Sequence, residues 1–328
     1  MEKRKNLIIN ICTISVLLII FLIGTFFDLE ISRAICDLDS GEYFTSSFIL
    51  ILSEIFGETV LYGLVSFAVL MLYLSDASVF ECNKNTKKVI KFFCIAVLFG
   101  INVFATFKVI GYFSDHYFIL EGSLSLLSIV CYLLGGCVFS LIWYLIAKKV
   151  PAEICKSLAI WSLIVALTVI LSQIVVQGAK PIFNRVRFRT MNFLEDYSYF
   201  SKWFSAKSQT SDTFEYLKNL VGSDGYKSFP SGHTACGASL ITLTLIPEYC
   251  VKLQSKCIKI LLNILAYSYC ALLGLSRILV GAHFLTDVVF SIIVTFSASY
   301  FSRYVIDKIF KRKTYGKTFE VKEVSLEE

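Results

Sequence analysis

The sequence predicts an all-α, polytopic helical bundle that spans a membrane. The chain has 328 residues, of which 56% are hydrophobic and 17% charged, whereas soluble domains are typically about 45–50% apolar with about 25% charged residues. The apolar residues form about eight long runs, each close to the roughly 20 residues that a helix needs to cross a bilayer. These runs do not alternate polar and apolar residues as barrel strands do, so we expect helices.

The first of the eight predicted spans follows Lys3, Arg4 and Lys5, a start that signal peptides share. Its apolar run is too long for a signal peptide and no small-residue cleavage site follows, so we expect it to be retained. The sixth and seventh spans are short and are expected to tilt less or to end among the lipid headgroups. The eight predicted spans cover residues 7–27, 50–74, 89–112, 125–147, 157–177, 234–250, 258–275 and 284–306.

The eleven cysteines do not indicate a disulfide framework. Most lie inside apolar runs, where a free cysteine packs as a small hydrophobic residue. Cysteine and histidine do not cluster at the spacing of metal ligands, so we predict no metal and no cofactor.

Basic residues in the loops predict the orientation of the bundle. If eight spans alternate, both tails and three basic loops fall on one side, opposite an acidic first loop. By the positive-inside rule, both termini are then cytoplasmic, in what we expect to be the plasma membrane, and loops 178–233 and 276–283 are extracytoplasmic. The basic side carries Lys3, Arg4, Lys5, Lys84, Lys87, Lys88, Lys148, Lys149, Lys156, Lys252, Lys256, Lys259, Lys308, Lys311, Arg312 and Lys313.

Residues 190–227 form the one extended polar stretch, and it is rich in aromatic side chains. It is either a solvated loop with its own small core or an amphipathic lid in the headgroup layer that guides lipids to a site. Because the sequence shows no linker or repeat, we predict a single membrane domain over residues 1–328. Glu54 and Glu58 lie one helical turn apart in the second span, where we favour a packing or interface role over a functional one.

The first segment that suggests chemistry is Lys180-Pro-Ile-Phe-Asn-Arg185-Val-Arg187. On a continuous helix Lys180 and Arg187 would share a face, and Arg185 would lie about 140° away. Convergent cations of this kind bind phosphate oxygens. Anchoring in the headgroups is the alternative.

The second segment is Pro230-Ser231-Gly232-His233, just before an apolar run. Ser231 is a good N-cap, and Gly232 allows a ligand to approach the free N–H groups of a helix start. A histidine here can donate a proton to a leaving oxygen. An ordinary capped helix is the alternative.

The third segment holds Ser276, Arg277, His283 and Asp287. A carboxylate one turn from an imidazole can fix its tautomer and leave the other ring nitrogen as a nucleophile. A purely structural pair is the alternative. Taken together, the segments predict phosphoryl transfer without a metal, in which cations stabilise the transferring group, one histidine attacks phosphorus and the other protonates the leaving oxygen.

These three segments resemble the type 2 phosphatidic acid phosphatase / vanadium haloperoxidase superfamily. Its signature is K-x6-R-P, P-S-G-H and S-R-x5-H-x3-D, and the order and spacings match here. Phe188 replaces the proline of the first motif, which affects the local loop shape. The resemblance covers about residues 125–306, and it implies a six-helix phosphatase core to which spans 7–27 and 50–74 are additional.

The resemblance implies a role for each matching residue. His283 would be the nucleophile that forms a phosphohistidine, Asp287 its orienting partner and His233 the general acid. The implied phosphate-binding groups are Lys180, Arg187, Ser231, Gly232 and Arg277.

The implied activity is hydrolysis of a lipid phosphate or diphosphate, of the undecaprenyl diphosphate, phosphatidate or phosphatidylglycerophosphate class. A lipid phosphotransferase with the same site, and a transporter or scaffold without activity, are the alternatives. A haloperoxidase is disfavoured because those relatives are soluble. The expected partners are the lipid phosphate and membrane lipids, with no nucleic acid; the oligomeric state is not predicted.

Overall fold

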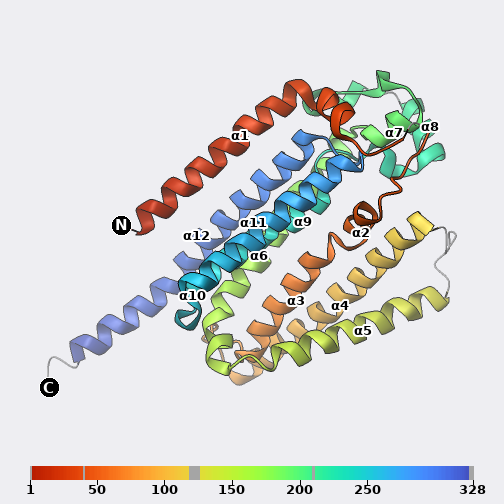
Figure 1. Cartoon of the computed structure of the whole chain (residues 1–328). Coiled ribbons are helices and arrows are strands. Elements are labelled where there is room, and N and C mark those ends of the chain that lie inside the picture. The colour runs from red at the N-terminus through yellow and green to blue at the C-terminus, as the bar shows by residue number, and fades with distance from the viewer. Residues whose placement is uncertain (1, 40, 118–125, 209–210, 325–328) are drawn as a thin grey trace.

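The computed structural model describes residues 2–39, 41–117, 126–208 and 211–324, and within these ranges the chain is all-α with no strands. Figure 1 shows long helices packed side by side, with both described ends of the chain at one end of the bundle and the short helices α7 and α8 at the other. Seven helices or helix pairs are long and apolar enough to cross a membrane. An all-α polytopic bundle is therefore confirmed, and the chain is an integral membrane protein.

The N-terminal half supplies five helices. The first helix, α1 (Glu2–Ile35), changes direction at Phe27, whose φ of −122° is not helical. It is longer than the predicted span and reaches the end of the bundle that carries α7 and α8. The second predicted span is interrupted, because α2 (Phe48–Phe56) and α3 (Thr59–Leu74) are separate helices. Two long helices, α4 (Lys84–Tyr117) and α5 (Leu126–Ala147), complete this half.

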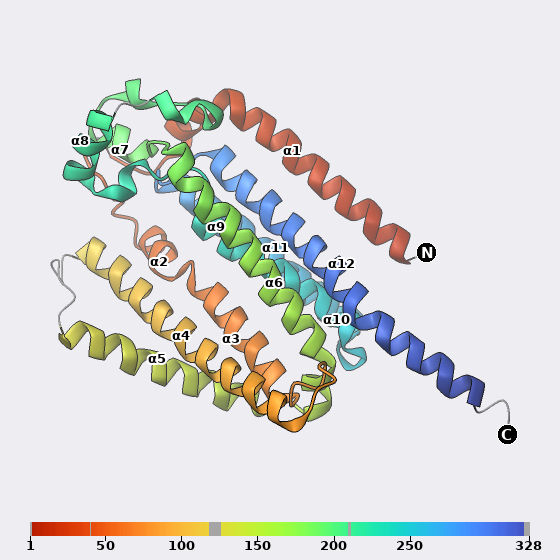
Figure 2. The same cartoon turned by 180° about the vertical axis from the view of Figure 1, so that it is seen from behind.

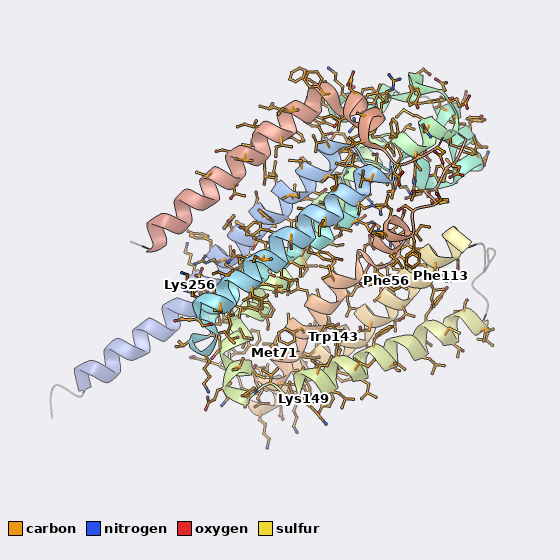
Figure 3. All side chains as sticks on the ribbon, in the orientation of Figure 1. Phe56, Met71, Phe113, Trp143, Lys149 and Lys256 are labelled. Carbon is orange, nitrogen blue, oxygen red and sulfur yellow. The ribbon has the colours of Figure 1, made fainter. Side chains whose placement is uncertain are left out.

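Glycines allow the helices of this half to approach closely. A Cβ on Gly136 would lie 2.3 Å from a methyl group of Val103, and one on Gly63 would lie 2.8 Å from the Trp143 ring. The contacts therefore join α5 to α4 and to α3. Figure 3 shows Trp143 toward the same end of the bundle as Lys149 and Lys256, whereas Phe56 and Phe113 lie toward the end with α7 and α8.

The C-terminal half contains the long helices α6 (Ala152–Phe183), α11 (Lys256–Leu279) and α12 (Leu285–Val324). Between α6 and α11 lie short helices: α7 (Phe188–Phe193), α8 (Ser211–Val221), α9 (Gly232–Ala238) and α10 (Ile246–Tyr249). Five 3₁₀ turns join them: η1 (Tyr197–Tyr199), η2 (Trp203–Ser208), η3 (Ser223–Tyr226), η4 (Ser239–Leu245) and η5 (Val251–Leu253).

The predicted span 234–250 is not one continuous helix, and it is absent from the seven candidate spans. In the 3₁₀ segment Ser239, Thr242 and Thr244 each donate to a carbonyl three or four residues earlier, a type of bond that often bends a helix. Even so, α9, η4 and α10 follow α11 along the bundle (Figures 1 and 2). Their common core with α3 and α6 includes Trp161, which is fully buried and donates to the Thr242 carbonyl.

The chain direction agrees with the pattern of basic loops. Figures 1 and 2 show the connections α3–α4, α5–α6 and α10–α11 at the same end as the two termini. The polar segment after α6 and the α11–α12 connection lie together at the opposite end. That polar segment is a series of short helices and turns, α7 to η3, with a small core around Phe188, Met191 and Leu217.

Candidate active site

The first motif does not lie on one helix. Asn184 adopts a left-handed conformation, with φ of 46°, and its N–H caps the Lys180 carbonyl, so α6 ends at Phe183. Arg187 then has extended geometry and precedes α7. The expectation that Lys180 and Arg187 share a helix face is therefore wrong: the chain turns between them. Phe188, which replaces the proline of the resemblance, begins α7 as a buried residue.

Arg185 does not join the other cations, although the helix ends early. Its guanidinium is fully buried, 2.7 Å from Asp287 Oδ1 and 3.0 Å from Asp28 Oδ2. It also donates to the Thr286 hydroxyl and to the Ser201 carbonyl. Because its guanidinium donates to four acceptors, Arg185 serves to neutralise and position these two buried carboxylates.

His283, from the third motif, contacts the backbone just before the second motif. In the connection between α11 and α12, its Nδ1 lies 2.5 Å from the Ser228 carbonyl oxygen. A carbonyl only accepts, so Nδ1 carries the proton and Nε2 is left with its lone pair. The i to i+4 carboxylate, Asp287, is 3.7 Å away, beyond a hydrogen bond. The expected direct His–Asp bond is thus replaced by a backbone carbonyl.

Asp287 orients His283 through Ser228. One of its oxygens accepts from the Ser228 hydroxyl at 2.5 Å and from the Phe284 N–H at 2.8 Å, while the other accepts from Arg185. Its backbone carbonyl accepts from the Ser231 N–H. The carboxylate therefore fixes the loop that presents the imidazole rather than the imidazole itself.

The imidazole of His283 is held in its neutral form. Burial lowers its pKa to about 3, and the nearby cations Arg187 and Lys180 add to this effect, whereas Asp287 opposes it. A neutral ring with a free Nε2 is the form that can attack an electrophile at neutral pH.

The second motif forms the start of α9. The Ser231 hydroxyl accepts from the Thr234 N–H as an N-cap, as the residue pattern predicts. A Cβ on Gly232 would lie 3.3 Å from Lys180 Nζ, so the glycine lets this ammonium group approach the helix start. Next to it, His233 is buried, with Nε2 2.9 Å from the Glu54 carbonyl oxygen and Nδ1 3.4 Å from Glu58 Oε1.

Arg277 joins the same cluster from the end of α11. Its Nη2 is 3.0 Å from Glu54 Oε1, an atom that Arg189 also approaches, at 3.1 Å. Arg189 in turn shares Asp224 with Arg187, at 2.9 and 2.6 Å. Partial desolvation raises the pKa of Asp224, whose side chain remains 57% exposed, but these two guanidinium groups outweigh this effect and hold the pKa well below its usual value.

Several donors of the three arginines remain unused. Within the part of the chain that the structure describes, Nε of Arg187, Nε of Arg189, and both Nε and Nη1 of Arg277 are buried without a hydrogen-bond partner. Buried N–H groups of this kind are costly unless a ligand satisfies them. The cluster has five cations and three carboxylates among the described residues, an excess of two positive charges that suits a phosphate dianion. The cations are Lys108, Lys180, Arg187, Arg189 and Arg277, and the carboxylates are those of Glu54, Glu58 and Asp224.

Comparison with known proteins identifies this region. Residues 161–311 match the family model described as PAP2 superfamily. This part of the chain is similar to the PAP2 superfamily. The match confirms the resemblance inferred from the motifs and, with the seven candidate spans, makes the chain a membrane protein of the phosphatase type. No match was found among curated proteins, and none among solved structures.

The PAP2 region contains all three motifs but not every group around them. Asp28, Glu54 and Glu58 lie before residue 161 and reach the motif residues from α1, from α2 and from the break between α2 and α3. Residue patterns left Glu54 and Glu58 as packing residues and did not single out Asp28, Arg189 or Asp224. Glu54 and Glu58 could have been found from the sequence, because an acidic side chain inside an apolar span is energetically unfavourable unless it has partners.

Proposed function

We propose that the chain hydrolyses a lipid phosphate or diphosphate through a phosphohistidine on His283. The observation that carries this proposal is the set of buried, unpartnered N–H groups on Arg187, Arg189 and Arg277, together with a His283 ring whose pKa is lowered mainly by burial and further by Arg187. Guanidinium donors that converge on one volume bind the oxygens of a phosphoryl group and stabilise the charge of its transition state.

In the first half of the reaction, Nε2 of His283 attacks phosphorus in line and a P–N bond forms. The bond between phosphorus and the leaving oxygen breaks, and His233 gives that oxygen a proton. Lys180, Arg187 and Arg277 hold the other oxygens, with Ser231 and Gly232 at the helix start, while Asp287 keeps His283 in place. In the second half, water loses a proton to His233, attacks phosphorus and releases phosphate as the P–N bond breaks.

The helices support a lipid as the substrate. The site lies at one end of a bundle whose outer surface is apolar, so a phosphate headgroup can enter it while the acyl or prenyl chain stays among the helices. The class of undecaprenyl diphosphate, phosphatidate and phosphatidylglycerophosphate fits this requirement.

Phosphate release from a panel of these lipids in detergent, with EDTA present, tests the function. We expect turnover that vanadate blocks and that His283→Ala abolishes, with His233→Ala slower by about 100- to 10,000-fold. Glu153→Gln, at the far end of the bundle, is the matched control and should retain full activity. Turnover by His283→Ala equal to that of the wild type would refute the proposal. Transfer of phosphate to an added alcohol or lipid instead of water would identify a phosphotransferase.

We also propose that both termini face the cytoplasm and that the site faces outward, in a single domain of 328 residues. The basic loops lie at the end that carries the termini, which supports this orientation. A C-terminal fusion to a fluorescent protein that folds only in the cytoplasm should fluoresce, and loss of fluorescence in a correctly inserted protein would reverse the assignment.

A further inference from the structure

Glu58 contacts the imidazole of His233, and none of the three motifs includes it. The residue lies where the second predicted span is interrupted, between the end of α2 at Phe56 and the start of α3 at Thr59. A Cβ on the adjacent Gly57 would lie 3.1 Å from His233 Cδ2 and 2.6 Å from Leu273. The glycine therefore lets the break come close enough for Glu58 Oε1 to approach His233 Nδ1, at 3.4 Å.

The contacts of the two ring nitrogens of His233 indicate which of them can donate a proton to the substrate. Its Nε2 lies 2.9 Å from the Glu54 carbonyl oxygen, and since a carbonyl only accepts, that nitrogen keeps its proton. A proton for a leaving oxygen must therefore come from Nδ1, which is the nitrogen that faces Glu58. The Nδ1 to carboxylate distance is long for a hydrogen bond, so a substrate oxygen can replace the carboxylate without losing a strong contact.

Several polar groups hold the carboxylate of Glu58 in place. Its oxygens accept from the hydroxyl groups of Tyr62, at 3.0 Å, and Tyr112, at 3.4 Å, and Lys108 lies 3.8 Å away. A carboxylate beside an imidazole favours the protonated ring. This matters here because burial lowers the pKa of His233 to about 4, and Glu58 is the main group that opposes the decrease.

We propose that Glu58 is a positioning residue that places a proton on Nδ1 of His233 for transfer to the leaving oxygen. The inference rests on the proposed function. The P–O bond breaks as the Nδ1 proton moves to the lipid oxygen, leaving a neutral ring with Nε2–H on the Glu54 carbonyl. In the second half Nδ1 takes a proton from the attacking water, and the carboxylate again balances the charge of the ring.

Other charged and titratable groups also act on His233 and must be kept constant in a test. Arg277 opposes protonation of the ring and Glu54 favours it, whereas the Tyr112 ring packs against it at an angle of 58°, with ring centroids 5.2 Å apart. The groups around the ring come from α2, the α2–α3 break, α4, α6 and α11, and they are Glu54, Glu58, Lys108, Tyr112, Lys180 and Arg277.

The test replaces Glu58 by Gln, which keeps the shape and removes the charge. The protonated ring is the active form, so kcat/KM falls as pH rises through the pKa of His233, and the variant should show this fall about one pH unit lower than the wild type, with about 10-fold slower turnover at neutral pH. For Glu58→Asp, the pH at which kcat/KM falls should lie between the values for the wild type and Glu58→Gln. Phosphatidate and undecaprenyl diphosphate are the substrates, and Glu153→Gln is the control. An unshifted pH profile in a folded Glu58→Gln variant would overturn the proposal.

A second measurement does not depend on turnover. With only three histidines in the chain, ¹⁵N-histidine NMR in detergent follows the protonation of His233 directly, assigned by its loss in His233→Gln. In the presence of vanadate, Glu58→Gln should lower the protonation midpoint of His233 by about one pH unit. An unchanged midpoint refutes the role of Glu58. A shifted midpoint in a protein that hydrolyses no lipid on the panel would instead refute the proposed function.

Discussion

His283 is buried beside the Ser228 carbonyl, and its burial has a measurable effect on stability. The pKa of His283 falls from its ordinary value of 6.5 to about 3 through burial. Between these values the unfolded chain binds a proton that the folded protein does not, so stability decreases as pH falls from about 6.5 toward 3.

His283→Gln should therefore reduce the pH dependence of stability in that window. Removing one such proton lowers the slope by up to about 1.4 kcal/mol per pH unit. Thermal unfolding of the variant and the wild type in detergent, from pH 7 to pH 4, measures this slope. Identical slopes would show that the imidazole is protonated in the folded protein.

Arg185 should be the most sensitive of the arginines to substitution. Its guanidinium is fully buried between Asp28 and Asp287, and removing one member of a buried charge network leaves the others unpaired. We expect Arg185→Gln to lower the free energy of unfolding by about 3–5 kcal/mol and to abolish activity. Arg303→Gln, with its partly exposed ion pairs, is the control and should cost less than about 1 kcal/mol. Equal losses in the two variants would contradict this role.

At the scale of elements, the polar segment after α6 reaches into the site through η3. Asp224 bridges Arg187 and Arg189 although its own side chain is 57% exposed. A substrate phosphate needs the same donors, so the carboxylate competes with it.

Asp224→Asn should therefore increase affinity for inorganic vanadate by about 10-fold, because a neutral amide competes less well for Arg187. The inhibition constant measures this, with Asp196→Asn, a partly exposed acid of the same segment, as the control. Weaker vanadate binding in Asp224→Asn would show that Asp224 positions the arginine rather than opposing the ligand.

How far the sequence predicts the structure also differs between elements. Helical class, the approximate spans and the family follow from apolar runs and from the motif spacing, since both are local properties of the chain. The end of α6 after Phe183 was missed because it depends on the left-handed Asn184, and the break at Gly57 was missed because a long apolar run conceals it. Charge pairs such as Asp28 with Arg185 join residues 157 positions apart, and no local pattern specifies them.

At the scale of the whole molecule, the N-terminal spans are part of the charge network around the site. Asp28 bonds to Arg185 and to the Thr286 N–H, and Glu54 bonds to Arg189 and Arg277. We expect a chain that begins after α1 to lose activity even though the region of residues 161–311 is intact. Phosphate release by this truncated protein, after its insertion has been checked, measures the effect; full activity would show that α1 is dispensable.

These pairings also impose an order on biogenesis. Asp28 leaves the ribosome well before Arg185 and Thr286, the partners of its carboxylate, exist, and an acid without its partners is costly next to the apolar part of a bilayer. The nascent N-terminal half thus enters the membrane in an unfavourable state that only the later helices relieve. Ribosome stalling or premature termination after α5 should yield a fragment that membrane proteases remove, whereas the complete chain closes its charge network and persists.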